Sequence, residues 1–489
     1  MKKNMKIAST LLMAGSLMLA ACNKYLEVQP DNRTKLDSPE KVAQLLTSAY
    51  PANDYICFAE SMSDNVGDRE HAGDQYSGDL RVNINAYHFI DYASTEKGSP
   101  DVYWQGCYEA IAAANQALQA CEAAGDNPAY APYKGEALLA RAYAHFMLVT
   151  FFAKTYDSTT AGADPGIPYV LVPETTLYAK YERKTVKYVY DMIEKDLLEG
   201  LPLISNAAFK IPAYHFNKAA ANAFAARFYL FKKDYNKVIQ YASQVFPGGN
   251  PADRLRDING TFQQLTRAER LENYTSASES ANLLLATTNS IWARAWIGYQ
   301  FGLNRERTIS IYYSGNVTGA VMDYPIYYYG ANVNNDGFEK FRENFIYTSA
   351  EIGYAYIYVP LLTTEEVLFN RAEANALTGH TDAAIADLNA FLSKRISGYD
   401  ASVNNLTLQK MMDFYGLDAQ KALVQTILDL KQMEFIQEGM RWLDILRYNL
   451  PVTHEEVGGE TTTILGNDPR KILQIPESAQ SAGIAPNPR

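Results

Sequence analysis

Residues 363–395, TTEEVLFNRAEANALTGHTDAAIADLNAFLSKR, predict two short helices joined by a tight turn. Thr363 and Glu366 have the spacing of a capping box, in which a hydroxyl and a carboxylate each bond a free N–H of the first turn. Apolar residues recur at helical spacing up to Gly379, which can supply the left-handed residue that ends a helix, and recur again over 384–392. The segment is therefore predicted to be a helical hairpin.

The same pattern occurs earlier in the chain, over 225–246, and aligns with the first without a gap. Five apolar positions of the second helix are filled in both copies, here by Val238, Ile239, Ala242, Val245 and Phe246. Two-helix repeats of about 34 residues with small residues where the helices cross resemble tetratricopeptide repeats. Further helices are predicted over 103–123, 134–152 and 185–201, and the fold class is expected to be mostly α.

The first 21 residues have the composition of a lipoprotein signal peptide. Lysines stand at positions 2, 3 and 6, an apolar run follows over 7–20, and small residues precede Cys22. This arrangement predicts cleavage before Cys22 and lipidation of its thiol, so that several acyl chains such as palmitate anchor the protein to a membrane. The alternative is an ordinary secreted protein with an incidental cysteine.

Composition excludes some classes of function. The formal net charge is −11, and it is more negative without the lysines of the signal peptide, so no nucleic-acid partner is expected. Cys57, Cys107 and Cys121 are odd in number and lack CxxC spacing, which predicts buried free thiols. No GxSxG, HExxH, Walker or dinucleotide-binding motif occurs in the sequence, and we do not expect an enzyme.

Residues 247–360 lose the helical pattern and are rich in aromatic residues. Alternation of apolar side chains predicts short strands around Tyr356 and around Ile311. Flat rings with polar edges suit the carbon face of a sugar, so a ligand site is expected between this region and the polar loops at 64–81, within a stretch of loops over 53–100. The candidate ligand-binding residues are Asp68, Tyr76, Arg81, Trp292, Trp296, Tyr299 and Tyr312. The alternative is that the rings form the core of a small sheet.

One segment has the spacing of a calcium-binding loop. Asn332, Asn334, Asp336 and Glu343 occupy positions whose oxygens converge on Ca²⁺ in such loops, and Gly337 stands where the turn is made. Asn replaces the usual first Asp, and helical flanks are not evident. Apart from calcium at this loop, no cofactor is expected, and a polar turn is the alternative.

Two interpretations concern buried or paired charges in helices. His145 and Arg141 lie beside an apolar stripe and are expected to be buried and hydrogen-bonded. Residues 419–450 predict one long helix ended by Pro451, in which Glu438, Asp444 and neighbouring arginines recur at three-residue spacing. We interpret these charges as an ion-paired helix surface.

Residues 437–447, QEGMRWLDILR, resemble a segment near the carboxyl end of SusD/RagB-type outer-membrane lipoproteins of Bacteroidetes. Other pieces agree in order along nearly the whole chain: the lipobox with Tyr25-Leu26-Glu27, Trp104 with Tyr108, Ile111 and Asn115, Gly135-Glu136-Ala137 with Arg141-Ala142, Arg371-Ala372-Glu373-Ala374, and Ile475-Pro476. Leu430-Lys431 departs from the Glu-Arg of many members, which weakens an ion-pair argument at this position.

The resemblance implies a fold of tetratricopeptide-like helical hairpins forming a right-handed scaffold, with irregular loops and small β elements in an inserted ligand-binding region. The parts would be the signal peptide (1–21), an N-terminal helical part (22–246), the aromatic-rich region (247–360) and a C-terminal part (361–489). It also implies a surface-exposed, lipid-anchored protein of the outer membrane that captures oligosaccharide for a SusC-like TonB-dependent transporter. A repeat scaffold for outer-membrane assembly, or a binder of peptides or glycoproteins, is the alternative.

Overall fold

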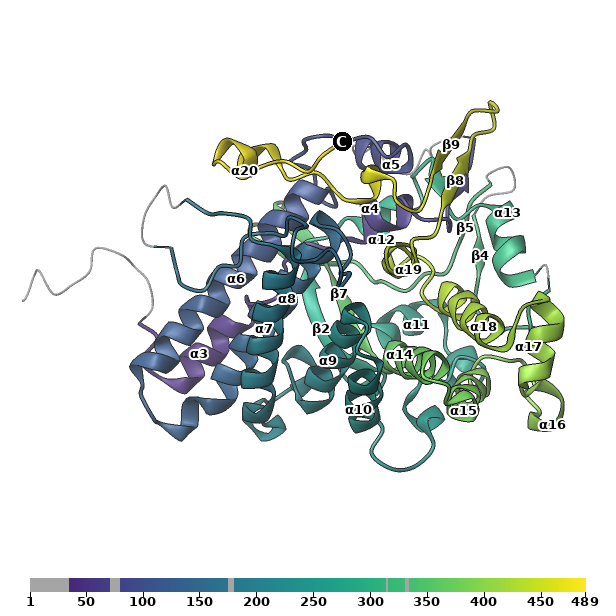
Figure 1. The fold of residues 1–489 in the computed structure, drawn as a ribbon, viewed down its shortest axis with the longest axis horizontal. Helices are drawn as coiled ribbons and strands as arrows, with labels where there is room; N and C mark the ends of the chain where they lie inside the picture. Colours follow the sequence, from purple (N-terminus) through teal and green to yellow (C-terminus); the bar gives the residue numbers. More distant parts are fainter. Residues whose placement is uncertain (1–34, 71–79, 175–179, 314, 330–333) are drawn as a thin grey trace, which may run out of the picture.

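Helical hairpins form the frame of the protein (Figure 1). The computed structural model describes residues 35–70, 80–174, 180–313, 315–329 and 334–489. The signal peptide and Cys22 lie outside this described part, so their prediction is not tested. The chain is mostly helical with small β elements, as predicted, whereas the right-handed, tetratricopeptide-like character of the frame stays a prediction.

The predicted hairpin at 363–395 is confirmed as α14 (Thr364–Leu377) and α15 (Thr381–Leu392). The Thr363 hydroxyl accepts the Glu366 N–H at 3.3 Å, and Gly379 has φ +81° in the turn. Phe369 and Phe391 meet across the hairpin with ring centroids 4.6 Å apart. The capping box is only half formed, because the Glu366 carboxylate pairs with Arg227 of another helix instead.

The second hairpin is α9 (Lys218–Lys232) and α10 (Tyr235–Val245), and α10 packs on α14, so the two hairpins are neighbours. On one side of them α6 (Pro100–Ala123), α7 (Ala131–Phe152) and α8 (Val186–Gly200) pack in sequence; on the other lie α17 (Leu408–Tyr415) and α18 (Ala419–Glu434). The remaining helices are α3 (Pro39–Leu46), α4 (Ile56–Ser61), α5 (Arg81–Tyr87), α11 (Arg267–Tyr274), α12 (Trp292–Ala295), α13 (Arg305–Thr308), α16 (Ala401–Asn404), α19 (Met440–Tyr448) and α20 (Glu477–Ser481).

The largest sheet has three antiparallel strands in the order β2-β7-β6, formed by β2 (Asn282–Thr288), β7 (Gly353–Thr363) and β6 (Asn344–Tyr347). The strand predicted around Tyr356 is therefore confirmed, and β7 runs directly into α14. The smaller sheets pair β1 (Gly67–Asp68) with β3 (Phe301–Gly302), β4 (Tyr327–Tyr328) with β5 (Asp336–Gly337), and β8 (Val452–Glu455) with β9 (Thr461–Ile464).

The prediction of one helix over 419–450 is wrong, because the chain breaks between α18 and α19. Gln437 and Gly439 adopt φ of +63° and +71° at the break. The buried Glu60 carboxylate on α4 accepts their backbone N–H groups at 2.8 and 2.9 Å. Burial raises the pKa of Glu60 to about 7. A residue far away in the sequence thus ends one helix and begins the next.

Two further local predictions are wrong. Residues 53–100 are not only loops, since they contain α4, β1 and α5. The segment around Ile311 is not a strand: α13 continues into one turn of π-helix over Ile309–Tyr313. Period-two alternation over five residues does not distinguish a strand from one helical turn whose other face is exposed.

The charges of 437–447 lie inside the molecule and not on a helix surface, which corrects that interpretation. Arg447 pairs with Glu373 of α14 at 2.7 Å, and Asp444 accepts from Lys431 of α18 at 2.6 Å. Glu438 accepts from Lys340 at 2.6 Å. Lys431 thus forms an ion pair in spite of its departure from the family pattern.

The three predicted free thiols, Cys57, Cys107 and Cys121, are buried and unpaired by disulfides. Across the described ranges, no helix is both long and apolar enough to cross a membrane. The division of the chain at 246/247 and 360/361 stays a prediction.

Candidate functional site

A polar cleft of about 290 Å³ lies between the segment after α4, the aromatic-rich region and the helices α17 and α18. Asp64 lines it from the first of these, and Arg307, Ser310 and Asn316 line it from the second. The third wall comes from α17 and α18, which contribute Phe414, Tyr415, Asp429 and Gln432. We call these eight residues the polar cleft.

Asp64 is positioned by the family segment. Arg441 of α19 forms a forked pair with it, with both N–O distances 2.7 Å. The Arg441 side chain is almost fully buried, whereas that of Asp64 is 28% exposed. A bidentate guanidinium–carboxylate pair fixes the plane of the carboxylate. The segment that carries the family resemblance therefore holds a carboxylate at the cleft.

On the opposite wall, Asp429 is held by two donors from its own region. The Tyr415 hydroxyl donates to one of its oxygens and Gln425 to the other, both at 2.7 Å. Burial raises the pKa of Asp429. Phe414 next to Tyr415 is 49% exposed, and their rings meet edge to face at 4.8 Å.

The wall from α13 and the π-helical turn Ile309–Tyr313 contributes a cation, Arg307. Asn304 begins α13 by accepting the Arg307 N–H at 2.9 Å, which fixes the start of the helix. Within the described part of the chain, no hydrogen bond or ion pair engages the Arg307 guanidinium. Asn316 bonds the carbonyl of Ala320 at 2.9 Å, which rigidifies the turn. Arg307 is thus a half-buried group with donors to spare in the cleft.

The predicted aromatic candidates lie in the core. Trp292, Trp296, Tyr299 and Tyr312 are 5%, 6%, 1% and 5% exposed. The Tyr312 hydroxyl donates to the carbonyl of Met433 at 2.7 Å. Trp296 packs so closely on Gly337 that a Cβ there would lie 2.4 Å from its ring. Their burial favours the alternative in which these rings are the core of this region.

The remaining candidates occupy different places. Asp68 is 7% exposed and accepts the N–H groups of Glu70 and Val457 at 2.8 and 3.1 Å. Arg81 is exposed at the start of α5, and Tyr76 lies outside the described residues. Arg69, which the sequence did not single out, is buried and donates to the carbonyls of Trp296 and Tyr299 at 2.8 and 3.1 Å. It joins the N-terminal segment to the aromatic-rich region.

The loop with calcium-like spacing is bound to arginines. Asp336 pairs with Arg305 at 3.0 Å, and Glu343 pairs with Arg294. The Asn334 side chain accepts the Arg305 N–H at 2.8 Å, and Asn332 lies outside the described residues. No group of three His, Cys, Asp or Glu side chains that could hold a metal occurs among the residues described. The calcium site stays a prediction.

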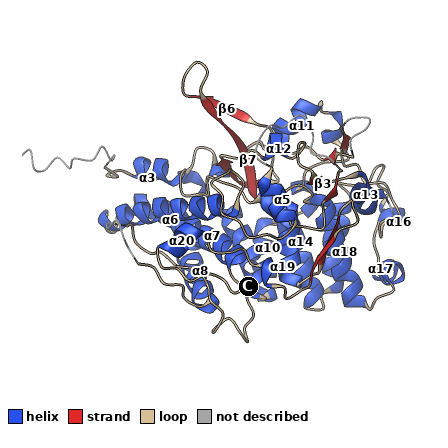
Figure 2. Ribbon diagram, turned by 90° about the horizontal axis from the view of Figure 1, so that it is seen from above, coloured by secondary structure: helices blue, strands red, loops and turns tan. Residues whose placement is uncertain are grey.

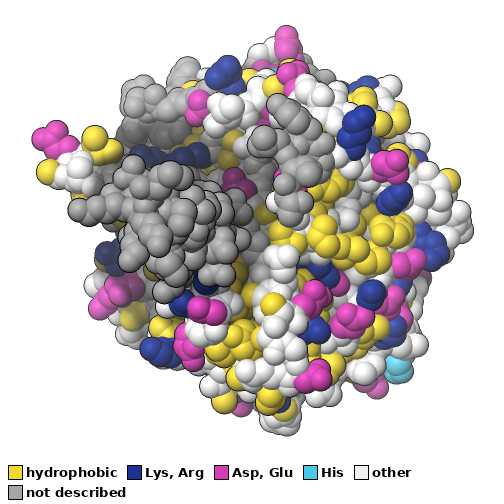
Figure 3. Space-filling model, turned by 90° about the vertical axis from the view of Figure 1, so that its left-hand side faces the viewer, with side chains coloured by type: hydrophobic (Ala, Val, Ile, Leu, Met, Phe, Trp, Pro, Cys, Tyr) yellow, Lys and Arg dark blue, Asp and Glu magenta, His cyan; other side chains and the backbone are white. Residues whose placement is uncertain are grey.

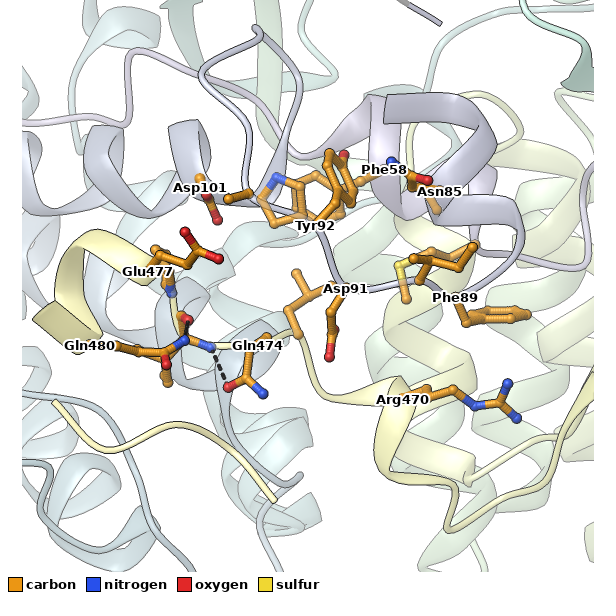
Figure 4. A pocket seen from close by; sticks show the side chains of 18 residues that line it. Phe58, Asn85, Phe89, Asp91, Tyr92, Asp101, Arg470, Gln474, Glu477 and Gln480 are labelled. Atoms are coloured by element: carbon orange, nitrogen blue, oxygen red, sulfur yellow. Dashed lines mark hydrogen bonds between the residues drawn. The ribbon is translucent and has the colours of Figure 1, made fainter. Parts of the chain in front are cut away.

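A smaller cleft of about 140 Å³ lies between 85–101 and the C-terminal tail (Figure 4). Two of its four charged side chains form ion pairs at its edges, Asp91 with Arg489 and Arg470 with Asp468, each with one contact of 2.7 Å. Gln474 accepts the Ile475 N–H at 2.9 Å within the tail. The cleft is the seam along which the tail docks on the N-terminal part.

On the face drawn in Figure 3, acidic and basic side chains are interspersed, and hydrophobic side chains gather on its right-hand half. Interspersed charges give a weak long-range field. The polar cleft combines a guanidinium, two carboxylates, two amides and exposed rings. Together such groups can bond hydroxyls and cover an apolar face.

Sequence reasoning missed most of the cleft residues. Arg307, Asn316 and Asp429 stand in unremarkable local sequences, and only the tertiary fold brings them to one place. Phe414-Tyr415 before Gly416 was a usable signal, because two adjacent rings at the end of a short helix cannot both face its core.

Comparisons with known proteins agree over almost the whole chain. Residues 24–230 match the family described as "Starch-binding associating with outer membrane", and residues 230–479 match the family described as "SusD family". No curated protein matches significantly.

Solved structures share the fold. A SusD superfamily protein from Bacteroides thetaiotaomicron superposes with a TM-score of 0.66 at 19% identity, covering 93% of this chain and 100% of that one. A SusD superfamily protein from Bacteroides vulgatus gives 0.66 at 21%, covering 93% and 98%. A SusD-like carbohydrate-binding protein from Bacteroides vulgatus gives 0.65 at 16%, covering 91% and 96%. Because the SusD family match spans half of the sequence and begins where the first match ends, this chain belongs to the SusD family.

Proposed function

We propose that this protein is a lipid-anchored nutrient-binding protein of the outer membrane. It captures oligosaccharide in the polar cleft and delivers it to a SusC-like TonB-dependent transporter. It works as a binding protein and not as an enzyme. Support comes from membership of the family, and from a neighbour of the same fold that is named as a carbohydrate-binding protein.

The observation that carries the proposal is the composition of the cleft. Arg307 brings unused donors, Asp64 is oriented by Arg441, and the ring of Phe414 is half exposed at the edge. Sugars present hydroxyls around a flat carbon face, which requires donors, acceptors and a ring within one concavity.

Calorimetry with a panel of neutral and acidic glycans tests the cleft. Arg307→Ala is expected to weaken binding of the recognised glycan about tenfold or more, because each charge-assisted bond contributes roughly 1.5–3 kcal/mol. Arg342→Ala is the matched control: its side chain is 53% exposed and paired with Glu272 outside the cleft. Equal affinity of both variants and the wild type would show that the cleft is not the glycan site.

Delivery of the oligosaccharide requires a transporter partner and a lipid anchor, and each of these is tested by a separate measurement. Cys22→Ser is expected to release the protein from membranes and to abolish labelling with palmitate. The tagged lipoprotein is expected to co-purify with a TonB-dependent transporter. If the transporter co-purifies while every glycan and peptide in the panel fails to bind, the scaffold alternative is correct.

The proposed calcium site is tested separately by thermal unfolding. A rise in melting temperature with calcium that disappears in Asp336→Ala would support the metal. No rise at saturating calcium would end this proposal, while leaving the glycan site unaffected.

A further inference from the structure

A second and larger concavity, of about 640 Å³, lies away from the polar cleft and shares no residue with it. It is bounded by α3, by the start of α7, by the loop at 208–215 and by strands β2 and β7. Apart from Tyr50, which follows α3, its aromatic lining comes from three separate segments: Tyr133, Phe209, Tyr214, His215 and Tyr358. We call these five residues the aromatic groove.

The rings of the groove contact one another and are held in place. Phe209 and His215 stack with centroids 4.4 Å apart, and Tyr133 meets Phe209 edge to face at 6.0 Å. Tyr214 and Tyr358 lie 5.7 Å apart on the side of β7. Their flat faces are therefore arranged before any ligand arrives, which lowers the entropic cost of binding.

The tyrosines continue outward along β7. Tyr354, Tyr356 and Tyr358 alternate with the buried Ala355 and Ile357, so their side chains share one face of the strand. Tyr356 and Tyr358 have ring centroids 5.6 Å apart, and Tyr354 is 45% exposed. Figure 2 shows the β6–β7 hairpin projecting from the body of the molecule. The three residues, the tyrosine strip, extend the groove by roughly 13 Å at about 3.3 Å per residue.

A fixed polar group lies beneath the rings. Glu136 is fully buried and accepts from Tyr50 at 2.6 Å and from His215 Nδ1 at 2.8 Å. The bond at Nδ1 sets the tautomer and leaves Nε2 as an acceptor, and within the described residues no protein group bonds it. The other oxygen of Glu136 likewise has no partner there.

The rim adds neutral polar groups and one charge of each sign. Gln44, Thr47 and Thr287 line the groove together with Glu40 and Lys210. The site therefore combines ring faces with hydroxyl and amide edges, and the two charges of its rim cancel. This chemistry disfavours anions and nucleic acid and matches an uncharged polyhydroxylated chain.

We propose that the aromatic groove and the tyrosine strip form a second carbohydrate-binding site, which takes an extended neutral oligosaccharide. The length of the strip requires a chain of several sugar units. The inference shares its ligand class with the proposed function but none of its residues, so either site can exist without the other.

Calorimetry and affinity electrophoresis with maltoheptaose, cellohexaose and a neutral mannan test this site on the mature protein. The double variant Tyr354→Ala/Tyr356→Ala is expected to bind the recognised chain at least about tenfold more weakly, because two ring contacts are lost. Tyr347→Ala is the matched control, since it lies on the same hairpin, is 69% exposed and lies outside the strip. Unchanged melting temperatures verify that the variants fold.

The Arg307→Ala background separates the two sites. Binding that survives Arg307→Ala and is lost with the two tyrosines supports the groove and overturns the cleft. Binding lost only with Arg307→Ala overturns the groove and leaves the cleft. Failure of all three probes, or equal loss with Tyr347→Ala, also overturns the groove.

Hydrogen exchange shows where on the protein the oligosaccharide binds. The recognised oligosaccharide is expected to slow amide exchange at 208–215 and 353–358 in the Arg307→Ala protein. Protection there by an extended apolar peptide and not by the oligosaccharides would overturn the carbohydrate assignment in favour of strand addition at β6.

Discussion

His145 on α7 is fixed in its neutral form by two hydrogen bonds. Its Nε2 accepts the Val170 N–H at 3.0 Å, and its Nδ1 lies 2.8 Å from the Arg141 carbonyl, to which it donates. The side chain is fully buried, and this burial lowers the pKa of His145 to about 3. Protonation of the His145 imidazole would place a positive charge without an acidic partner in the core, which is unfavourable. The sequence-based expectation that His145 is buried and hydrogen-bonded is confirmed.

This lowered pKa makes the stability depend on pH in a definite direction. The unfolded chain takes up a proton on His145 below pH 6.5, whereas the folded protein does not until about pH 3. The contribution of His145 to the free energy of unfolding is therefore fully present above pH 6.5. It falls by about 1.4 kcal/mol per pH unit as the pH is lowered from 6.5 towards 3. His145→Gln keeps both hydrogen bonds possible and should flatten this slope in urea unfolding between pH 6.5 and 5. Parallel slopes in wild type and variant would refute the assignment, and exposed His380→Gln is the control.

A second prediction at this scale concerns the buried pair of Arg395 and Glu434, with N–O distances of 2.7 and 2.8 Å. Although burial raises it, the pKa of Glu434 is held below its usual value by the Arg395 charge. Arg395→Met leaves that carboxylate unpaired and should cost about 3–5 kcal/mol in chemical unfolding. Arg395→Met/Glu434→Leu should recover much of the loss. A double variant no more stable than the single one would show that the pair does not act as a unit.

At the scale of elements, the hairpin α14–α15 belongs to the frame and lines neither the polar cleft nor the aromatic groove. Leu388 and Phe391 are 1% and 0% exposed, and their stripe packs on α14. Leu388→Ala or Phe391→Ala should therefore lower the free energy of unfolding by about 2–5 kcal/mol and leave glycan preference unchanged. Leu417→Ala, at a 38% exposed site, is the control for size. A change of specificity in either core variant would contradict the assignment to the frame.

The break between α18 and α19 determines the direction in which α19 runs. It turns α19 so that Arg441 reaches Asp64 in the polar cleft while Arg447 reaches Glu373 in the hairpin. Arg441 and Arg447 are six residues apart on α19, so at about 100° per residue their side chains point to different sides of that helix. Glu60 stabilises the break by bonding the N–H groups that the break leaves free.

At the scale of the whole molecule, the C-terminal tail joins the two parts that match the two family descriptions. Asn487 donates to the carbonyls of Phe152 and Leu473 at 3.0 and 2.8 Å, and Phe152 is the last residue of α7. The Leu473 N–H donates to the Phe151 carbonyl at 2.9 Å. The tail thus satisfies carbonyls that the end of α7 leaves free.

Asn487→Ala should destabilise the protein by about 1–3 kcal/mol, because two buried carbonyls lose their donor. Amide exchange should rise at 469–489 and at the end of α7, and it should not rise in the hairpin α14–α15. The exposed Asn467→Ala is the matched control. Amide exchange that rises to the same extent in the hairpin α14–α15 would show that the tail does not stabilise the end of α7 locally.

By itself, the sequence determined the helical frame and the family. The hairpins at 225–246 and 363–395 were predictable because their apolar period, alanines and Gly379 act locally, through spacing along one helix. The strand β7 followed in the same way from alternation. The signal peptide, likewise a local pattern, stays a prediction.

Tertiary structure alone decided which residues line the polar cleft and the aromatic groove. Trp292 and Asp68 have the residue types of a binding site and are buried, whereas Arg307, Asp429 and Tyr358 are brought to concave surfaces by elements distant in sequence. The helix break at Gln437 depends on Glu60, nearly the whole chain away, and no local pattern records it. Burial and convergence are properties of long-range packing, so they cannot be read from the periodicity of one segment.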